Sequence, residues 1–389
     1  MEPARELELA RDRRFVALRQ VCEEAVATGV VPGMVVLCAD AGQVLFHEAF
    51  GCAEVEPDAR PATPQTIYDV ASLTKAVVTS VLVMRAVAAG RLDLDAPIER
   101  LLPEFRGAGK SSVTARLLLC HASGLPAHRP FYLGAPAGPA AREFVLRAAA
   151  EEPLVEAPGA RSLYSDVGFI LLGGALERAS GLRLDVLAGR AIFEPLGLRA
   201  TGFVDLGDKT ARDRLRGAGP VAATESCVAR GRMLVGEVHD RNAAAMGGIA
   251  GHAGLFSTAS DLAAISGALC GAWAAPGAGA IVDHEVIAEF WRPCGIVGST
   301  WRLGWDGPAP VSSQAGHRLS RGAVGHLGFT GCSLWIDPPR ARFIVTLANR
   351  VHPTVRDDPR FRALRPAVQD AAVAAMEDDW PHAHARPRP

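Results

Sequence analysis

The chain has 389 residues, of which 49% are hydrophobic and 21% charged, so it is long enough to bury a sizeable globular core. Its formal net charge of −1, without a dense basic run, argues against a nucleic-acid partner held through phosphates. The N-terminus lacks the apolar core of a secretory signal, and the most apolar stretch, residues 76–84, is too short to span a bilayer. We therefore expect a cytoplasmic protein without a membrane span.

The first part of the chain predicts a helix, a hairpin and a second helix. Residues 7–28 carry apolar positions at helical spacing. Residues 34–39 and 44–50 are two apolar segments around a short glycine turn, which is typical of a β-hairpin. Residues 72–89 form a strongly apolar helix with Ser72 at its start.

The middle of the chain, from about residue 95 to 300, reads as mainly helical, with many Gly and Pro turns and no internal repeat. Strand patterns return at residues 332–336 and 342–348, which are separated by a proline turn and predict a second hairpin. Residues 366–376 predict a closing helix with its proline in the first turn. The eight cysteines show no metal-like spacing and are expected to be reduced and mostly buried.

Strands at both ends with helices between them predict an α+β fold, in which one antiparallel sheet is assembled from both chain ends. We expect one domain over residues 1–377, with a mostly helical insertion over about 72–300 packed against the sheet. Residues 378–389 predict a disordered tail. The cleft between the sheet and the insertion is the expected place for a site.

Lysine is rare in this chain, because only three of its 41 basic residues are lysine and the rest are arginine. One of the three, Lys75, stands three positions after Ser72. Residues at this spacing share a helix face, and a buried lysine can lose its proton whereas arginine cannot. The pair therefore predicts an activated serine nucleophile. The simpler alternative is a helix-capping serine with a lysine on a solvated face.

Two later motifs could complete such a site. In Tyr164-Ser165-Asp166, a phenol beside a lysine ammonium can shift toward phenolate and take the serine proton. In residues 325–331, glycines let a substrate approach a strand edge, and His326 could donate a hydrogen bond to it. Taken alone, each has a plainer interpretation, namely Asp166 as a helix cap and a glycine turn with a surface histidine.

Together and in this order, the motifs resemble those of the serine β-lactamases, the penicillin-binding peptidases and the carboxylesterases built like class C β-lactamases. That superfamily carries S-x-x-K, then Y-x-N, then K-T-G or H-x-G. Residues 118–126 and 247–258 are also similar to it, and the resemblance covers residues 10–375. It implies a β-lactamase/transpeptidase-like fold and a covalent acyl-enzyme, with no metal and no cofactor.

The resemblance also implies roles for individual residues. Ser72 would be the nucleophile, with Tyr164 or Lys75 as the acceptor of its proton. The backbone N–H groups of Ser72 and of Phe329, placed on the late strand, would form the oxyanion hole. The residues expected to contact the substrate are Asp166, His326, Leu327 and Gly328.

Two departures from the family pattern shape the expected chemistry. Asp166 stands where the family usually has asparagine, and its charge would keep Lys75 as an ammonium and favour Tyr164 as the proton acceptor. It could also select a substrate that bears an amine. His326 and Leu327 replace the lysine and threonine that hold the carboxylate of a β-lactam, so neutral esters are favoured.

We therefore expect a serine hydrolase that acts through an acyl-enzyme on a small-molecule ester or an amide, most consistent with a carboxylesterase. A β-lactamase or a D-alanyl-D-alanine or D-amino peptidase is the first alternative, and a weakly active or inactive ligand-binding homologue is the second. The pair His239-Asp240 could touch a metal, but a solvated turn is the expected interpretation.

Overall fold

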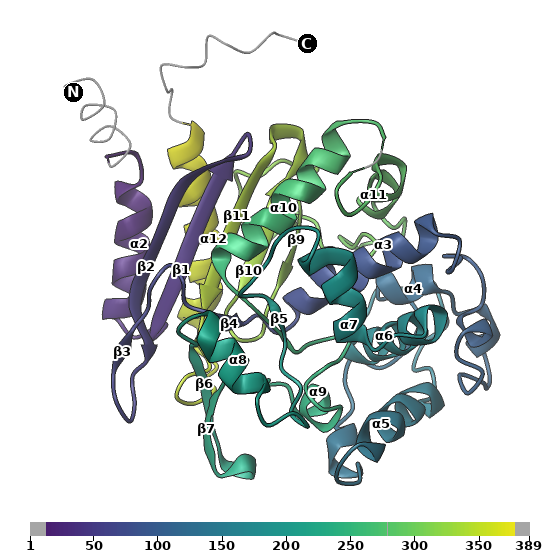
Figure 1. The fold of residues 1–389 in the computed structure, drawn as a ribbon. Coiled ribbons are helices and arrows are strands. Elements are labelled where there is room, and N and C mark those ends of the chain that lie inside the picture. The colour runs from purple at the N-terminus through teal and green to yellow at the C-terminus, as the bar shows by residue number, and fades with distance from the viewer. Residues whose placement is uncertain (1–12, 278, 378–389) are drawn as a thin grey trace.

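The computed structural model of the chain describes residues 13–277 and 279–377 (Figure 1). The predicted tail, residues 378–389, and the start of the first predicted helix lie outside the described residues.

A six-stranded antiparallel sheet built from both chain ends forms the centre of the fold, in the order β3-β2-β1-β11-β10-β9. The strands are β1 (Gly33–Asp40), β2 (Gln43–Glu54), β3 (Arg60–Pro61), β4 (Tyr68–Asp69), β5 (Gly202–Phe203), β6 (Ala223–Cys227), β7 (Arg232–Val235), β8 (Leu255–Ser257), β9 (Val324–Leu327), β10 (Ser333–Asp337) and β11 (Arg342–Ala348). The predicted α+β fold with one sheet from both termini is confirmed, as are the two hairpins.

The helices are α2 (Val16–Ala27), α3 (Val81–Ala88), α4 (Ala115–Leu119), α5 (Ala140–Glu151), α6 (Asp166–Ser180), α7 (Leu184–Ala188), α8 (Ala211–Ala218), α9 (Arg241–Ala245), α10 (Ala259–Ala274), α11 (His284–Phe290) and α12 (Pro359–Glu377). None of the described helices is both long and apolar enough to cross a membrane. All eight cysteines are free thiols, and six of them are buried, as the sequence predicts.

Helices cover both faces of the sheet, which explains why its central strand is apolar throughout (Figure 1). On β1, Val35 and Leu37 face the core shared with the large helical part. Met34 and Val36 face a second core beneath α2 and α12. Successive side chains of a strand point to opposite faces, so a strand buried on both faces needs a continuous apolar run.

The segment between the two halves of the sheet is less uniformly helical than the sequence predicts. It also holds the short pairs β4-β8-β5 and β6-β7, whose strands are two to five residues long. Strands this short carry too few alternating positions to show a period. Helix α10 of this segment packs directly on β1 and β11, so the sheet is covered by part of the predicted insertion.

The closing helix begins seven residues before its predicted start. It runs from Pro359, so Pro366 lies in its interior and not in its first turn. A proline there has no N–H to donate to the carbonyl of Arg362. The side chain of Gln314 donates to that carbonyl instead, at 3.3 Å, which offsets the lost helical hydrogen bond.

Candidate active site

A cavity of about 540 Å³ lies where the turn at Ser72, the start of α6, the loop before α9 and the end of β9 meet. Of the residues predicted to form the site, those that line it are Ser72, Tyr164, Asp166, Leu327, Gly328 and Phe329. Chain segments separated by more than 250 residues therefore contribute to one concave wall.

Ser72 lies on a strained turn directly before a buried helix. The preceding residue, Ala71, has a φ of 47°, which side chains with a Cβ rarely adopt. Its N–H donates to the buried Asp69 carboxylate at 2.9 Å, and its carbonyl accepts from Thr74 at 2.6 Å. These hydrogen bonds hold the strained backbone and present Ser72 to the cavity. The helix is π-helical over Lys75–Ser80 before it continues as α3.

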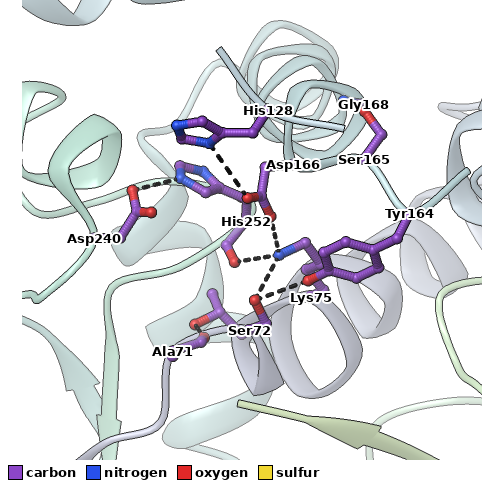
Figure 2. Close-up of polar contacts among 12 residues, drawn as sticks. Ala71, Ser72, Lys75, His128, Tyr164, Ser165, Asp166, Gly168, Asp240 and His252 are labelled. Carbon is purple, nitrogen blue, oxygen red and sulfur yellow. Dashed lines mark hydrogen bonds and ion pairs between the residues drawn. The ribbon is translucent and has the colours of Figure 1, made fainter. Parts of the chain in front are cut away.

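The three predicted catalytic side chains converge at the Ser72 hydroxyl (Figure 2). Lys75 Nζ donates to Ser72 Oγ at 2.9 Å, and the Tyr164 hydroxyl donates to the same oxygen at 2.9 Å. Lys75 is fully buried and donates its other two hydrogens to the His252 carbonyl at 2.8 Å and to Asp166 Oδ1 at 2.7 Å. Each ammonium hydrogen thus has an acceptor. The alternative interpretation, a lysine on a solvated helix face, is therefore excluded.

The electrostatics of the site keep Lys75 charged. Burial alone would lower the pKa of Lys75, but the Asp166 charge and Tyr164 raise it above its ordinary value. Burial alone would likewise raise the pKa of Asp166, but the Lys75 charge and the His128 ring, whose Nδ1 lies 3.7 Å from Asp166 Oδ2, hold it well below its ordinary value. The pair is therefore an ammonium and a carboxylate across the neutral range, as the aspartate in place of asparagine predicts.

The expected shift of Tyr164 toward phenolate is wrong for the resting site. Burial raises the pKa of Tyr164, and the Lys75 charge, which lowers it, is opposed by the Asp166 charge. The phenol is therefore neutral at rest. It lies with its ring 5.0 Å from Lys75 Nζ and 4.7 Å from the His121 ring.

The segment of His121 holds Tyr164 in place. The His121 carbonyl accepts from Leu163 N–H at 2.7 Å, and its ring Nδ1 accepts from Ser165 N–H at 3.0 Å. Ser165, and not Asp166, caps helix α6, because its hydroxyl accepts from the Gly168 N–H at 3.2 Å. Asp166 is therefore the first residue of α6, and its carboxylate is free to face Lys75.

The predicted oxyanion donors lie on the same cavity wall. Phe329 is not on a strand but in the turn between β9 and β10. Among the described residues, neither its N–H nor that of Ser72 donates to a protein acceptor. Arg365 donates to the Gly328 carbonyl at 2.7 Å. Because a trans peptide is planar, this contact directs the Phe329 N–H of the same peptide away from Arg365.

His326 does not reach the cavity, in contrast to its predicted contact with substrate. Its side chain is buried, and its ring Nδ1 donates to the Leu327 carbonyl at 2.8 Å. Burial lowers the pKa of His326 to about 3, so the ring is neutral. Successive side chains of a strand alternate between faces, so Leu327 lines the cavity while His326 packs against Tyr164 and Trp301.

Several polar residues of the site have no signal of their own in the sequence. Asp240 accepts from the His252 ring at 2.8 Å, and this contact anchors the His252 carbonyl that binds Lys75 (Figure 2). Asp69 accepts from the His239 N–H at 2.7 Å. His239-Asp240 is therefore part of the cavity wall and not a solvated turn. In the sequence, only the stretch over residues 247–258, which is similar to the family, indicated that His252 belongs to the site.

The chain matches the Beta-lactamase family over residues 18–369. It is 30% identical over 361 residues to the N-acetylmuramyl-L-alanine amidase of Bacillus subtilis (strain 168), covering 87% of this chain and 81% of the relative. It is 31% identical over 358 residues to a putative D-alanyl-D-alanine carboxypeptidase of Escherichia coli (strain K12), covering 84% of this chain and 80% of the relative.

Solved structures show the same fold. EstCE1, a hydrolase with promiscuous acyltransferase activity, superposes with a TM-score of 0.71 at 23% identity, covering 94% of this chain and 99% of that protein. The octameric penicillin-binding protein homologue from Pyrococcus abyssi gives a TM-score of 0.69 at 25% identity, covering 89% and 75%. With its fold, its match over most of the chain and its convergent Ser-Lys-Tyr cluster, this chain belongs to the Beta-lactamase family of serine hydrolases.

Proposed function

We propose that this protein is a carboxylesterase that cleaves its substrate through an acyl-enzyme on Ser72. The observation that carries the proposal is that Ser72 Oγ lies 2.9 Å from both Lys75 Nζ and the Tyr164 hydroxyl. These three groups also face a cavity large enough for a small substrate.

We assign the proton transfers from the charge of Lys75. Lys75 is an ammonium and can only donate, so the one neighbour able to receive the Ser72 proton is the Tyr164 oxygen. The Tyr164 hydroxyl donates to Ser72 Oγ at rest, so it first turns its hydrogen toward the leaving-group oxygen. It then takes the Ser72 proton as it passes its own to that oxygen. Ser72 Oγ bonds to the substrate carbonyl carbon, and the leaving alcohol departs. Water then attacks the acyl-serine, giving one proton to Tyr164 while Tyr164 returns one to Ser72.

Two sets of donors stabilise the charge that develops during this reaction. The N–H groups of Ser72 and Phe329 face the developing oxyanion, and one such donor typically contributes about 3 kcal/mol to the transition state. The Lys75 ammonium stabilises negative charge on Ser72 Oγ as its proton leaves.

A second candidate is hydrolysis of an amide in a peptidoglycan fragment or a D-peptide. The names of the Bacillus subtilis and Escherichia coli relatives favour it, and the same acyl-enzyme chemistry serves an amide once its nitrogen is protonated. Efficient β-lactam hydrolysis is disfavoured, because Leu327 at the cavity wall cannot donate to the carboxylate of a β-lactam.

Three substrates tested on wild type and Ser72→Ala separate these candidates: 4-nitrophenyl acetate, a chromogenic cephalosporin and an N-acetylmuramyl-L-alanine peptide. Ser72-dependent turnover of the ester, with an acetyl adduct on Ser72 by intact mass, is the expected result. Turnover of the amide alone would support the second candidate. Turnover of none, without an adduct, would identify a ligand-binding homologue. A cytoplasmic location remains part of the proposal, to be tested by fractionating cells that express the full chain.

A further inference from the structure

Two cysteines from distant parts of the chain lie together beside the active site. Cys120 directly follows α4, and Cys294 lies in the loop after α11. The Ser162 hydroxyl donates to the Cys120 carbonyl at 2.9 Å. It also lies 2.7 Å from the Ser299 hydroxyl, whose oxygen is 3.6 Å from Cys294 Sγ. The two sulfurs interact directly, since each has the largest influence on the pKa of the other. No step of the proposed acyl transfer uses either of them.

The surroundings of the two sulfurs favour a thiolate at one and a thiol at the other. The interaction with Cys120 first, against the effect of burial, lowers the pKa of Cys294 to about 5, and the Ile296 backbone and the Ser299 hydroxyl act in the same direction. The same interaction first, and then burial, raise the pKa of Cys120, against the charge of Arg116. The Cys120 thiol donates to the Arg116 carbonyl at 2.8 Å. At neutral pH, Cys294 is therefore the thiolate, the form that reacts with oxidants.

Cys294 is also within reach of a small solute. It and Cys52 are the two half-buried cysteines, whereas the other six are buried. The loop around it is open to solvent, and Val297 in this loop is 94% exposed. The Arg302 charge interacts with Cys294 as well as with Asp306, which favours the thiolate further. Redox-sensitive cysteines typically combine a low pKa, access to solvent and a second cysteine beside them, and Cys294 has all three.

Each of the two cysteines is joined to a residue that packs against Tyr164. Cys120 directly precedes His121, whose backbone has a left-handed φ of 56° and whose ring lies 4.7 Å from the Tyr164 ring. The Cys294 N–H donates to the Trp301 carbonyl at 3.0 Å. The Trp301 ring lies 4.3 Å from the His121 ring and 5.8 Å from the Tyr164 ring. A covalent bond between the two sulfurs would therefore pull on both segments that hold the phenol in place.

We propose that a hydroperoxide converts Cys294 and Cys120 into a disulfide, and that this bond slows turnover by displacing Tyr164. With hydrogen peroxide, the Cys294 thiolate bonds to one peroxide oxygen, the O–O bond breaks, and the released hydroxide takes a proton from solvent to give water. The Cys120 sulfur then bonds to the Cys294 sulfur of the resulting sulfenic acid. The S–O bond breaks, and the departing hydroxide takes the Cys120 proton to give a second water. The sulfurs are oxidised by two electrons in total, which the peroxide receives.

The disulfide itself is tested on the full chain, first reduced and then treated with hydrogen peroxide at neutral pH. Peptide mapping without reductant should find Cys120 and Cys294 in one cross-linked pair, and dithiothreitol should release both thiols. In Cys120→Ser the reaction should stop at a sulfenic acid on Cys294, which dimedone labels. Cys52→Ser is the matched control, because Cys52 is also half-buried, and it should form the same disulfide as wild type.

The effect on turnover is measured as kcat for 4-nitrophenyl acetate, compared between the oxidised and the reduced form of each protein so that the effect of a substitution itself cancels. In wild type and Cys52→Ser, oxidation should lower kcat by about 10–100-fold, because a displacement of about 1 Å at a reacting group can cost this much. Dithiothreitol should restore the lost kcat. Cys294→Ser cannot form the bond, so its kcat should not change under the same treatment.

Peroxide treatment that leaves Cys120 and Cys294 unlinked would overturn the disulfide. A linked protein with unchanged kcat would overturn the effect on turnover, and so would an equal loss of kcat in Cys294→Ser. The peptide map does not depend on the reaction at Ser72. A disulfide that forms in a protein without any esterase activity would therefore contradict the proposed function and still support the modification site.

Discussion

The substitution Asp166→Asn tests which group carries the serine proton. Asp166 lies 2.7 Å from Lys75 Nζ and is the leading cause that raises the pKa of this buried lysine. Removing an opposite charge at this distance lowers a lysine pKa by about 1–3 units, or about 1.4–4 kcal/mol. Because burial acts in the same direction, the pKa of Lys75 in the variant should fall below its ordinary value of 10.5.

The assay is the pH dependence of kcat/KM for 4-nitrophenyl acetate between pH 5 and 10. If Lys75 acts as an ammonium, wild type keeps its activity up to the alkaline end of this range. Asp166→Asn should then develop a new basic limb, in which activity is lost as Lys75 deprotonates. Asp357→Asn removes a carboxylate that is 90% exposed and does not line the cavity, so it should show no such limb.

The opposite outcome would refute this reasoning. If neutral Lys75 is the base, the variant becomes more active near neutral pH and its acid limb moves to lower pH. An unchanged profile would mean that Asp166 does not control the protonation of Lys75.

The same substitution should lower the free energy of unfolding. The pKa of Asp166 is depressed in the folded protein, so its contribution to stability is present above its ordinary value of 3.8 and is lost as the pH falls below it. The pKa of Lys75 is raised, so its contribution is present below 10.5 and is lost as the pH rises through the folded-state pKa. At pH 7, breaking the buried pair should cost about 3–5 kcal/mol, measured by urea unfolding.

Substitutions at three further positions test the proton carrier, the oxyanion turn and the close packing of the core. Tyr164→Phe should lower kcat/KM for the acetate ester by about 10²–10⁴-fold in steady-state assays, and a loss below tenfold would exclude the phenol as the proton carrier. Arg365→Met removes the hydrogen bond to the Gly328 carbonyl, so kcat for the acetate ester should fall about 10–100-fold with KM little changed. Arg365→Lys should recover part of the lost kcat. An equal loss of kcat in both variants would show that Arg365 does not position the oxyanion turn. Gly251→Ala places a Cβ 2.3 Å from the Phe169 carbonyl oxygen, so urea unfolding should show a loss of about 1–3 kcal/mol, and an unchanged midpoint would contradict the close packing.

Local patterns were sufficient for four of the six strands of the sheet and for the nucleophile; β3 was not predicted, and β9 lies partly in a segment interpreted as a glycine turn. The apolar runs of β1 and β11 are readable because strands buried on both faces need apolar residues throughout. Ser72 and Lys75 are readable because both lie within one turn of the chain, so their spacing alone brings their side chains together. Tyr164 lies 92 residues further along the chain, so its contact with Ser72 could be expected only from the family pattern.

What the sequence by itself determined is therefore whatever depends on near neighbours: the strands, the serine-lysine pair and the charge of Asp166. Only the tertiary structure decided that Tyr164 rests as a neutral phenol, that His326 packs against Trp301 and does not line the cavity, and that Arg365 contacts the oxyanion turn. The reason is that a pKa depends on how deeply a group is buried and on which charges lie near it. In this site those charges come from segments that are distant in the sequence, so the pKa values follow only once the chain has folded.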